Sequence, residues 1–262
     1  IAVTNNQFTM PDSNVTVSAT FAFQQEVEVT IGSGTGTTGG NYVPTNVWYK
    51  YSLTQQIYTA AELGDAGNIT AISFYYNGSE SSGARALDIY MTHTTNSTIS
   101  SWVTQSSSNL VYSSSFTFTQ GWNTITLATP FPYDGTSNLL LTVDDNTNGY
   151  DVGSSTYFYT YSTGANRAIR YYSDTNNLSA TSSNSTSGST LQYNAQMKVT
   201  KLIAGPSVAQ YTVTASPNPV EGGTVAFGSK DNRDELVYDF EDGWQGWTTT
   251  SRSEERFSRD AE

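Results

Sequence analysis

Apolar and polar residues alternate in three short runs between residues 116 and 145. The runs are Phe116/Phe118, Ile125/Leu127 and Leu139/Leu141/Val143, and glycine, proline and Asp-Gly segments separate them. Alternation with a period of two between turn residues predicts a meander of antiparallel strands. Because each strand must cover its apolar face, the flanking residues should supply a second sheet. The pattern therefore predicts an all-β fold, an antiparallel β-sandwich.

Further alternating or aromatic segments lie on both sides of this meander and bring the expected total to about nine or ten strands, the spacing of a jelly-roll-like sandwich. Ala60–Leu63, followed by Gly64, predicts one helical turn. The polar residues 173–190 predict a mobile loop. The additional strands are expected at residues 47–51, 69–76, 87–91, 110–112, 157–161, 168–172 and 195–203.

Composition narrows the function classes. The chain of 262 residues has a net charge of -12, which disfavours binding to phosphate backbones and so argues against a nucleic-acid partner. It has no cysteine, which excludes disulfides and thiolate metal sites. No apolar run approaches the ~20 residues of a transmembrane helix, so no membrane insertion is expected within this sequence. No signal peptide opens the chain, which suggests a fragment of an exported protein.

Glycine and proline punctuation divides the chain into five expected parts. The main domain, a jelly-roll-like sandwich, is expected at residues 41–203. Residues 32–40 are glycine-rich and predict a linker. The flanking parts are the end of a small β-repeat at 1–31, the start of a second β-repeat at 204–236, and a truncated domain with a charged tail at 237–262.

Several segments carry a family resemblance. Tyr51-Ser-x-x-Gln-Gln-Ile-Tyr-Thr-Ala-x-Glu-Leu-Gly, Ile69-Thr-Ala-Ile-Ser-Phe-Tyr and Gly121-Trp-Asn-Thr-Ile-Thr-Leu resemble a β-sandwich module of Bacteroidetes multidomain surface proteins. FTMPDSNVTVSATF, which begins at Phe8, resembles the end of an internalin-B-type bacterial repeat. Val237-Tyr-Asp-Phe-Glu-Asp-Gly-Trp resembles the start of a cleaved-adhesin or choice-of-anchor J domain. The resemblance implies an extracellular or outer-membrane location and a role in adhesion or glycan binding.

Candidate catalytic residues are sparse. His93 is the single histidine, it falls at a predicted strand end, and no Gly-x-Ser-x-Gly elbow accompanies it, so a structural or exposed histidine is expected. A glycosidase would need two carboxylates facing each other across a cleft. No motif relates any two of the acids, and turn or capping roles account for them. They are Glu62, Asp65, Glu80, Asp88 and Asp134.

A polar cluster resembles the first half of a calcium loop. Asp144, Asn146 and Asn148 alternate, Gly149 follows, and Asp151 completes the set of oxygen donors. Oxygen ligands with this spacing suit one hard cation. Position twelve is a serine rather than a bidentate glutamate, and no helices flank the loop. A structural Ca²⁺ site and an Asx-rich hairpin loop therefore both remain open.

A row of aromatic side chains is the candidate binding surface. Tyr157, Tyr159 and Tyr161 share one face of a predicted strand, and Arg167 and Arg170 follow closely. Tyrosine rings pack against sugars or protein partners, and arginine adds charge-assisted donors. The same tyrosines could instead be core residues at the solvent-exposed edge of the sandwich.

Taken together, these features predict a non-catalytic extracellular adhesin-type module that binds a glycan or an extracellular protein ligand. A structural spacer in a large surface protein is the first alternative. Part of a secreted hydrolase is the second.

Overall fold

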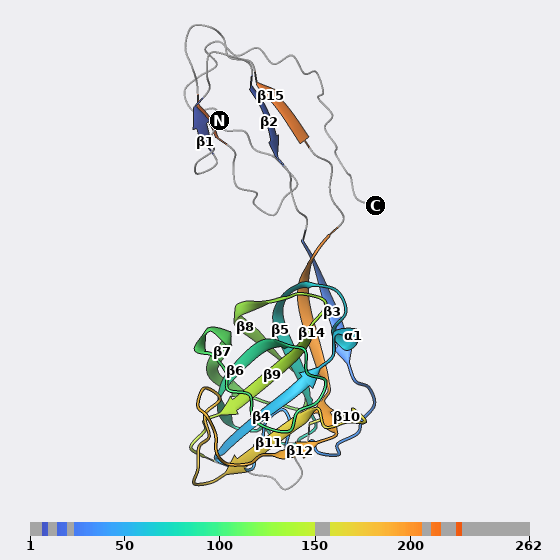
Figure 1. The fold of residues 1–262 in the computed structure, drawn as a ribbon, viewed down its shortest axis with the longest axis vertical. Helices are drawn as coiled ribbons and strands as arrows, with labels where there is room; N and C mark the ends of the chain where they lie inside the picture. Colours follow the sequence, from blue (N-terminus) through green and yellow to red (C-terminus); the bar gives the residue numbers. More distant parts are fainter. Residues whose placement is uncertain are drawn as a thin grey trace. The chain divides into compact units, whose positions relative to one another are not determined.

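A computed structural model describes residues 24–149 and 158–205, together with the backbones of four strands nearer the two ends of the chain. The chain divides into two compact units, Phe23–Pro206 and a second unit made of Ile1–Ala22 and Ser207–Glu262. The larger unit is an antiparallel sandwich, which confirms the predicted all-β class (Figure 1).

The sandwich has one six-stranded and one four-stranded sheet. The six-stranded sheet contains, in spatial order, β12 (Ser189–Leu191), β11 (Ala168–Ser173), β4 (Tyr51–Tyr58), β9 (Asn138–Asp145), β6 (Ala84–Thr94) and β7 (Leu110–Thr117). The four-stranded sheet contains β3 (Gln24–Ile31), β14 (Met197–Ala204), β5 (Gly67–Tyr76) and β8 (Gly121–Tyr133). The remaining elements are the β10 (Thr160–Ser162) and β13 (Tyr193–Ala195) pair, helix α1 (Ala60–Leu63) and the 3₁₀ turn η1 (Ser107–Asn109).

The chain changes sheet at most of its connections, from β3 to β4, β4 to β5, β5 to β6, β7 to β8 and β8 to β9. This alternation between two sheets is characteristic of a jelly roll. The inward apolar faces meet in one core, in which Ile89, Leu141 and Val143 from the first sheet join Ile72 and other residues from the second. The period-two runs of the sequence are thus the inner faces of the two sheets.

The first domain boundary needs a correction. Gln24–Ile31, predicted to belong to a separate β-repeat, forms β3 and pairs with β14 from Met197–Ile31 to Ala204–Gln24. The reason is visible in its pattern, because Val27, Val29 and Ile31 alternate with polar residues and suit an edge strand of the sandwich. The sandwich therefore begins near residue 23 rather than residue 41.

The glycine-rich segment 32–40 is not a loose linker. It is fixed against β10, because the Thr160 amide donates to the Gly36 carbonyl at 2.7 Å and the Phe158 amide donates to the Gly40 carbonyl at 2.9 Å. Gly40 is buried, and a Cβ atom there would overlap the Phe158 carbonyl oxygen. Glycine is needed at this position because two backbones approach each other too closely for a side chain.

We expect Gly40→Ala to destabilise the sandwich by about 1–3 kcal/mol, since the neighbouring backbone must move to admit the methyl group. Urea unfolding of the variant and the wild type measures the difference. Gly149→Ala is the matched control, because a Cβ there meets no atom within 4 Å. Equal losses in the two variants would show that the close approach at Gly40 is unimportant.

Two loops cover the outer face of the six-stranded sheet. The segment near residue 103 is held by Gln55, whose Nε2 donates to the Val103 carbonyl at 2.6 Å and whose Oε1 accepts from the Val103 amide at 2.9 Å. The segment 174–188, predicted to be a mobile loop, packs Ala180 against Leu53 and Tyr90. The outer face is thus sheltered rather than open to water.

The second unit is described only through four strands. β2 (Val15–Ala19) pairs antiparallel with β15 (Tyr211–Ala215), and β1 (Gln7–Thr9) pairs antiparallel with β16 (Thr224–Ala226). These strands were predicted to belong to two separate repeats, at 1–31 and 204–236, but they pair with each other. The predicted adhesin-like start at 237–262 lies outside the described residues.

Candidate ligand-binding cavity

A hydroxyl-rich cavity of about 490 Å³ lies on the outer face of the six-stranded sheet, near its β7 edge. β6, β7 and β9 form its floor and one side, and the loop 174–188 forms another wall. Its polar lining consists of Asp88, Tyr90, Ser113, Ser114, Ser115, Asp144, Asn146, Ser179 and Thr181, with Ala86 and Leu87 beside them. A volume of this size fits a small ligand.

Two carboxylates meet at the cavity floor. Asp88 of β6 and Asp144 of β9 are direct cross-strand partners, and Ser113 of β7 is the partner of Asp88 on the other side. Directly opposite residues in antiparallel strands have Cβ atoms roughly 4.5–5.5 Å apart and share one face. Asp88 is half-buried, whereas Asp144 is only 2% exposed. The cavity therefore contains one accessible and one buried carboxylate.

Asp144 is only partly hydrogen-bonded. Its Oδ2 accepts from the Ala180 amide at 2.7 Å, and this bond ties the loop 174–188 to the sheet. Its Oδ1 is buried and has no hydrogen-bond partner among the described residues. The pKa of Asp144 is raised to about 7, chiefly by burial; the hydrogen bond from Ala180 lowers it, and the negative charges of Asp88 and Asp145 add to the rise.

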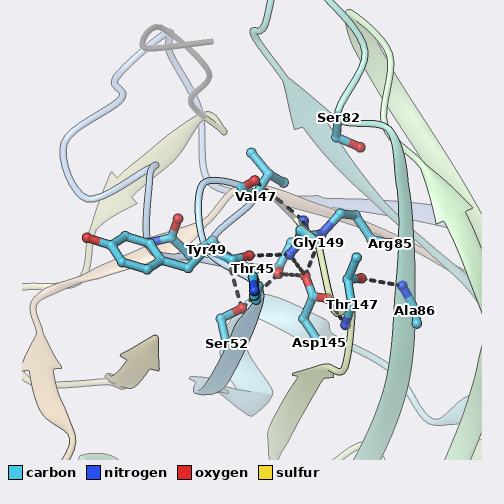
Figure 2. A network of polar contacts seen from close by, with 12 residues as sticks. Thr45, Val47, Tyr49, Ser52, Ser82, Arg85, Ala86, Asp145, Thr147 and Gly149 are labelled. Carbon is cyan, nitrogen blue, oxygen red and sulfur yellow. Dashed lines mark hydrogen bonds and ion pairs between the residues drawn. The ribbon is translucent and has the colours of Figure 1, made fainter. Parts of the chain in front are cut away.

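A buried ion pair holds the turn that follows β9. The Arg85 Nε donates to Asp145 Oδ2 at 2.8 Å, and its terminal nitrogens donate to the carbonyls of Tyr49, Gly149 and Val47. Figure 2 shows the Arg85 guanidinium surrounded by these oxygen atoms. Arg85 and Asp145 are both fully buried. This network fixes the segment 146–149 and with it the position of Asn146 at the cavity.

The Thr147 side chain closes the same turn. Its Oγ1 accepts from the Ala86 amide, and the Asn146 amide donates to the Ala86 carbonyl at 2.8 Å. Asn146 Nδ2 lies 3.4 Å from Asp88 Oδ2, and Asn146 Oδ1 accepts from Asn177 Nδ2 at 2.7 Å. The turn, β6 and the loop 174–188 are therefore joined around the cavity.

The described residues of the proposed calcium loop lie in two different places. Asp144 and Asn146 both line the cavity. Asn148 points elsewhere, because its Oδ1 accepts from the Tyr51 hydroxyl at 3.0 Å. Asp151 lies outside the described residues. In the described part of the chain, the predicted calcium ligands therefore do not converge on one point along the loop.

Tyr161 and Arg167, proposed as binding residues, share one internal partner. The Tyr161 hydroxyl donates to Glu62 Oε1 at 2.9 Å, and Arg167 lies 3.0 Å from both carboxylate oxygens of Glu62. Glu62 also accepts from the Thr59 amide and so caps α1. Burial and the nearby Glu62 raise the pKa of Tyr161 well above its usual value. These side chains hold α1 against the sheet.

Tyr159 lies in a different place. Its ring stacks on Tyr75 with centroids 4.1 Å apart, and Tyr75 meets Trp122 edge-on at 5.6 Å. Lys198 lies 5.0 Å above the Trp122 ring. Because these rings pack against one another, they do not form a flat row of free faces for a sugar ring. Tyr157, the first member of the proposed row, lies outside the described residues.

Arg170 belongs to a third cluster. Its guanidinium lies 3.7 Å from the centroid of Tyr42 and 5.0 Å from that of Tyr172, and the two tyrosines stack with centroids 5.8 Å apart. Cation–π contacts of this kind stabilise the packing of a loop on a strand. The four proposed binding residues that the structure describes thus do not form one surface.

His93 has a structural environment. Its Nε2 accepts from the Asp134 amide at 3.2 Å, and its ring lies near Phe131 and Tyr133. Asp134 accepts from Ser137 and Thr136, and these hydrogen bonds hold the pKa of Asp134 well below its usual value. The Ser137 hydroxyl donates to Asp134 rather than to His93, so these three residues are not arranged as a nucleophilic triad.

Asp88 is the cavity residue whose predicted role was wrong, because a turn or capping role was expected and Asp88 lies within β6. The sequence did contain a sign that both acids point outward from their strands. Asp88 lies between the inward Leu87 and Ile89, and Asp144 follows the inward Val143. Both acids therefore occupy outward positions of apolar strands. Which strands are neighbours, and in which register, decides whether such acids meet, and that information is not local to either strand.

Comparison with family models, with curated proteins and with solved structures finds no match for this chain. The resemblance to Bacteroidetes surface modules therefore stays a prediction. Within the described ranges, no helix has the length and apolar character that crossing a bilayer requires.

Proposed function

We propose that the sandwich is a non-catalytic extracellular recognition module that binds a glycan in the Asp88–Asp144 cavity. The observation that carries this proposal is the lining itself, in which a half-buried carboxylate, an amide and a series of hydroxyls surround about 490 Å³.

The chemistry of the lining fits a polyhydroxylated ligand. The Asp88 carboxylate can accept two or more ligand hydroxyl hydrogen bonds, and hydrogen bonds to a charged acceptor are the stronger ones. Ser113, Ser115 and Ser179 can both donate and accept, as sugar hydroxyls do. Tyr90 adds an aromatic ring to the wall. The surface location suggested by the sequence resemblance supports the same ligand class.

A glycoside hydrolase is the second candidate, and one specific observation favours it. Asp88 and Asp144 lie side by side on one face of the sheet with different burial, and the pKa of Asp144 is raised to about 7, as in a pair of nucleophile and general acid. Against it, Asp144 is only 2% exposed, so a sugar ring cannot lie against its carboxyl group as a general acid requires.

The test is a glycan and mucin array probed with the full chain. The proposal predicts binding that Ser113→Trp lowers by at least about tenfold, because the indole fills the cavity opposite Asp88. Asp88→Asn is expected to weaken the same binding. Ser162→Trp, at an exposed serine of β10, is the matched control and should bind like the wild type.

A blank array, or binding that survives Ser113→Trp, would overturn the proposal. Release of reducing sugar from a bound glycan, lost in both Asp88→Asn and Asp144→Asn, would instead establish the hydrolase.

A further inference from the structure

A buried carboxylate oxygen without a partner is the least satisfied group at the cavity. Asp144 is 2% exposed, and its Oδ1 has no hydrogen-bond partner among the described residues. A buried charge costs several kcal/mol unless it is paired. Such a group requires either a proton or a cation at that oxygen.

The charged side chains around Asp144 make its negative charge still less favourable. The charges that act on Asp144 are those of Asp88 and Asp145, and both are negative. The ion pairs of the described residues, Arg85–Asp145, Arg167–Glu62 and Lys198–Glu28, include neither Asp88 nor Asp144. Arg85 binds Asp145, which points to the opposite face of β9. The protein side chains around Asp144 therefore leave its charge uncompensated.

The residues beside Asp144 in the sheet carry hard oxygen donors. Asp88 lies directly across from Asp144, and Ser113 lies directly across from Asp88. Asn146 lines the same cavity, and its Nδ2 lies 3.4 Å from Asp88 Oδ2. No group of three or more acidic or histidine side chains gathers within the described residues, so hydroxyl, amide and water oxygens must complete a coordination shell.

We propose that the cavity floor binds a divalent cation, Ca²⁺, between the carboxylates of Asp88 and Asp144. Ca²⁺ takes six to eight oxygen ligands at about 2.3–2.6 Å in flexible geometry and accepts water among them, which suits an open cavity with two carboxylates. The two principal ligands come from neighbouring strands rather than from consecutive loop positions. A cation offsets the charge of Asp144 while the carboxylate stays ionised, so Oδ2 still accepts the Ala180 hydrogen bond that holds the loop 174–188.

This inference goes beyond glycan binding and does not depend on it. A cation could organise the cavity for any ligand, or only stabilise the fold. The two proposals are separated by the probe, since CaCl₂ alone tests the cation and the array tests the glycan.

Thermal unfolding of the full chain in CaCl₂ and in EDTA tests the proposal. A cation that binds only the folded state raises the midpoint, and the rise grows with the logarithm of its concentration. We expect this rise in the wild type and in Glu80→Gln, an exposed acid away from the cavity. We expect its loss in Asp88→Asn and in Asp144→Asn. Asp144→Asn removes the unpaired charge, so this variant should fold in EDTA at least as well as the wild type.

Terbium provides a local readout. Tb³⁺ replaces Ca²⁺ at oxygen sites and emits when a nearby tyrosine is excited, and Tyr90 lines the same cavity. The wild type should show emission that Ca²⁺ displaces, and Asp88→Asn should show at most a tenth of it. An unchanged midpoint in CaCl₂, or emission and a midpoint rise that persist in the Asp88→Asn/Asp144→Asn double variant, would overturn the proposal.

Discussion

Arg85→Leu is expected to destabilise the sandwich by about 3–5 kcal/mol, because it leaves the Asp145 carboxylate buried without its cation. The same change removes the donors to the carbonyls of Tyr49, Gly149 and Val47. The segments 45–49 and 146–149 would then lose the group that joins them. Urea unfolding followed by tryptophan fluorescence measures the loss.

The exposed ion pair between Lys198 and Glu28 is the control for this prediction. Its Nζ–Oε1 distance is 2.7 Å, similar to the buried pair, but Glu28 is half exposed. Lys198→Ala should cost less than about 1 kcal/mol, as surface pairs do. If Arg85→Leu cost no more than Lys198→Ala, the buried network would not be what holds the turns around the cavity.

The stability of the protein in EDTA is expected to depend on Asp144 and on pH. The folded state raises the pKa of Asp144 from 3.8 to about 7, so the folded protein binds a proton more tightly than the unfolded chain. Asp144 therefore contributes stability below about pH 4, and that contribution is lost as the pH rises through 7. The full change corresponds to roughly 4 kcal/mol.

The wild type should consequently lose stability relative to Asp144→Asn between pH 5 and pH 8. Asparagine has nearly the same shape but does not titrate, so the difference between the two proteins isolates the carboxyl group. Unfolding in urea at both pH values, with EDTA present, measures it. A difference that stays constant with pH would show that Asp144 keeps an ordinary pKa and that its environment is less confining than described.

Most strands of the sandwich were predictable because their pattern is local. β4 was not, since a strand was predicted at residues 47–51 and β4 spans Tyr51–Tyr58. Leu139, Leu141 and Val143 alternate with outward residues, and all three are buried in the core. The helical turn Ala60–Leu63 was likewise predictable, since Glu62 reaches back to the Thr59 amide and Gly64 follows. In each case the residues that decide the conformation lie within a few positions of one another.

The cavity was not predictable for the opposite reason. Asp88 and Asp144 are far apart in the chain and meet only because β6 and β9 are neighbours in one particular register. The loop 174–188 looks polar throughout, yet the Ala180 amide and methyl group attach it to the outer face. Similarly, Tyr159 and Tyr161 alternate correctly for one strand face, but Tyr75 and Glu62 from other elements determine what each ring contacts.

The most direct test of the cavity as the recognition site is an amide NMR shift map of the full chain, recorded while the best-binding glycan of the array is added. Binding in the cavity predicts the largest shifts at residues 86–90, 113–115, 144–146 and 179–181. Largest shifts around Tyr75, Trp122 and Tyr159, or around Tyr42 and Arg170, would contradict the assignment and place recognition on an aromatic cluster instead.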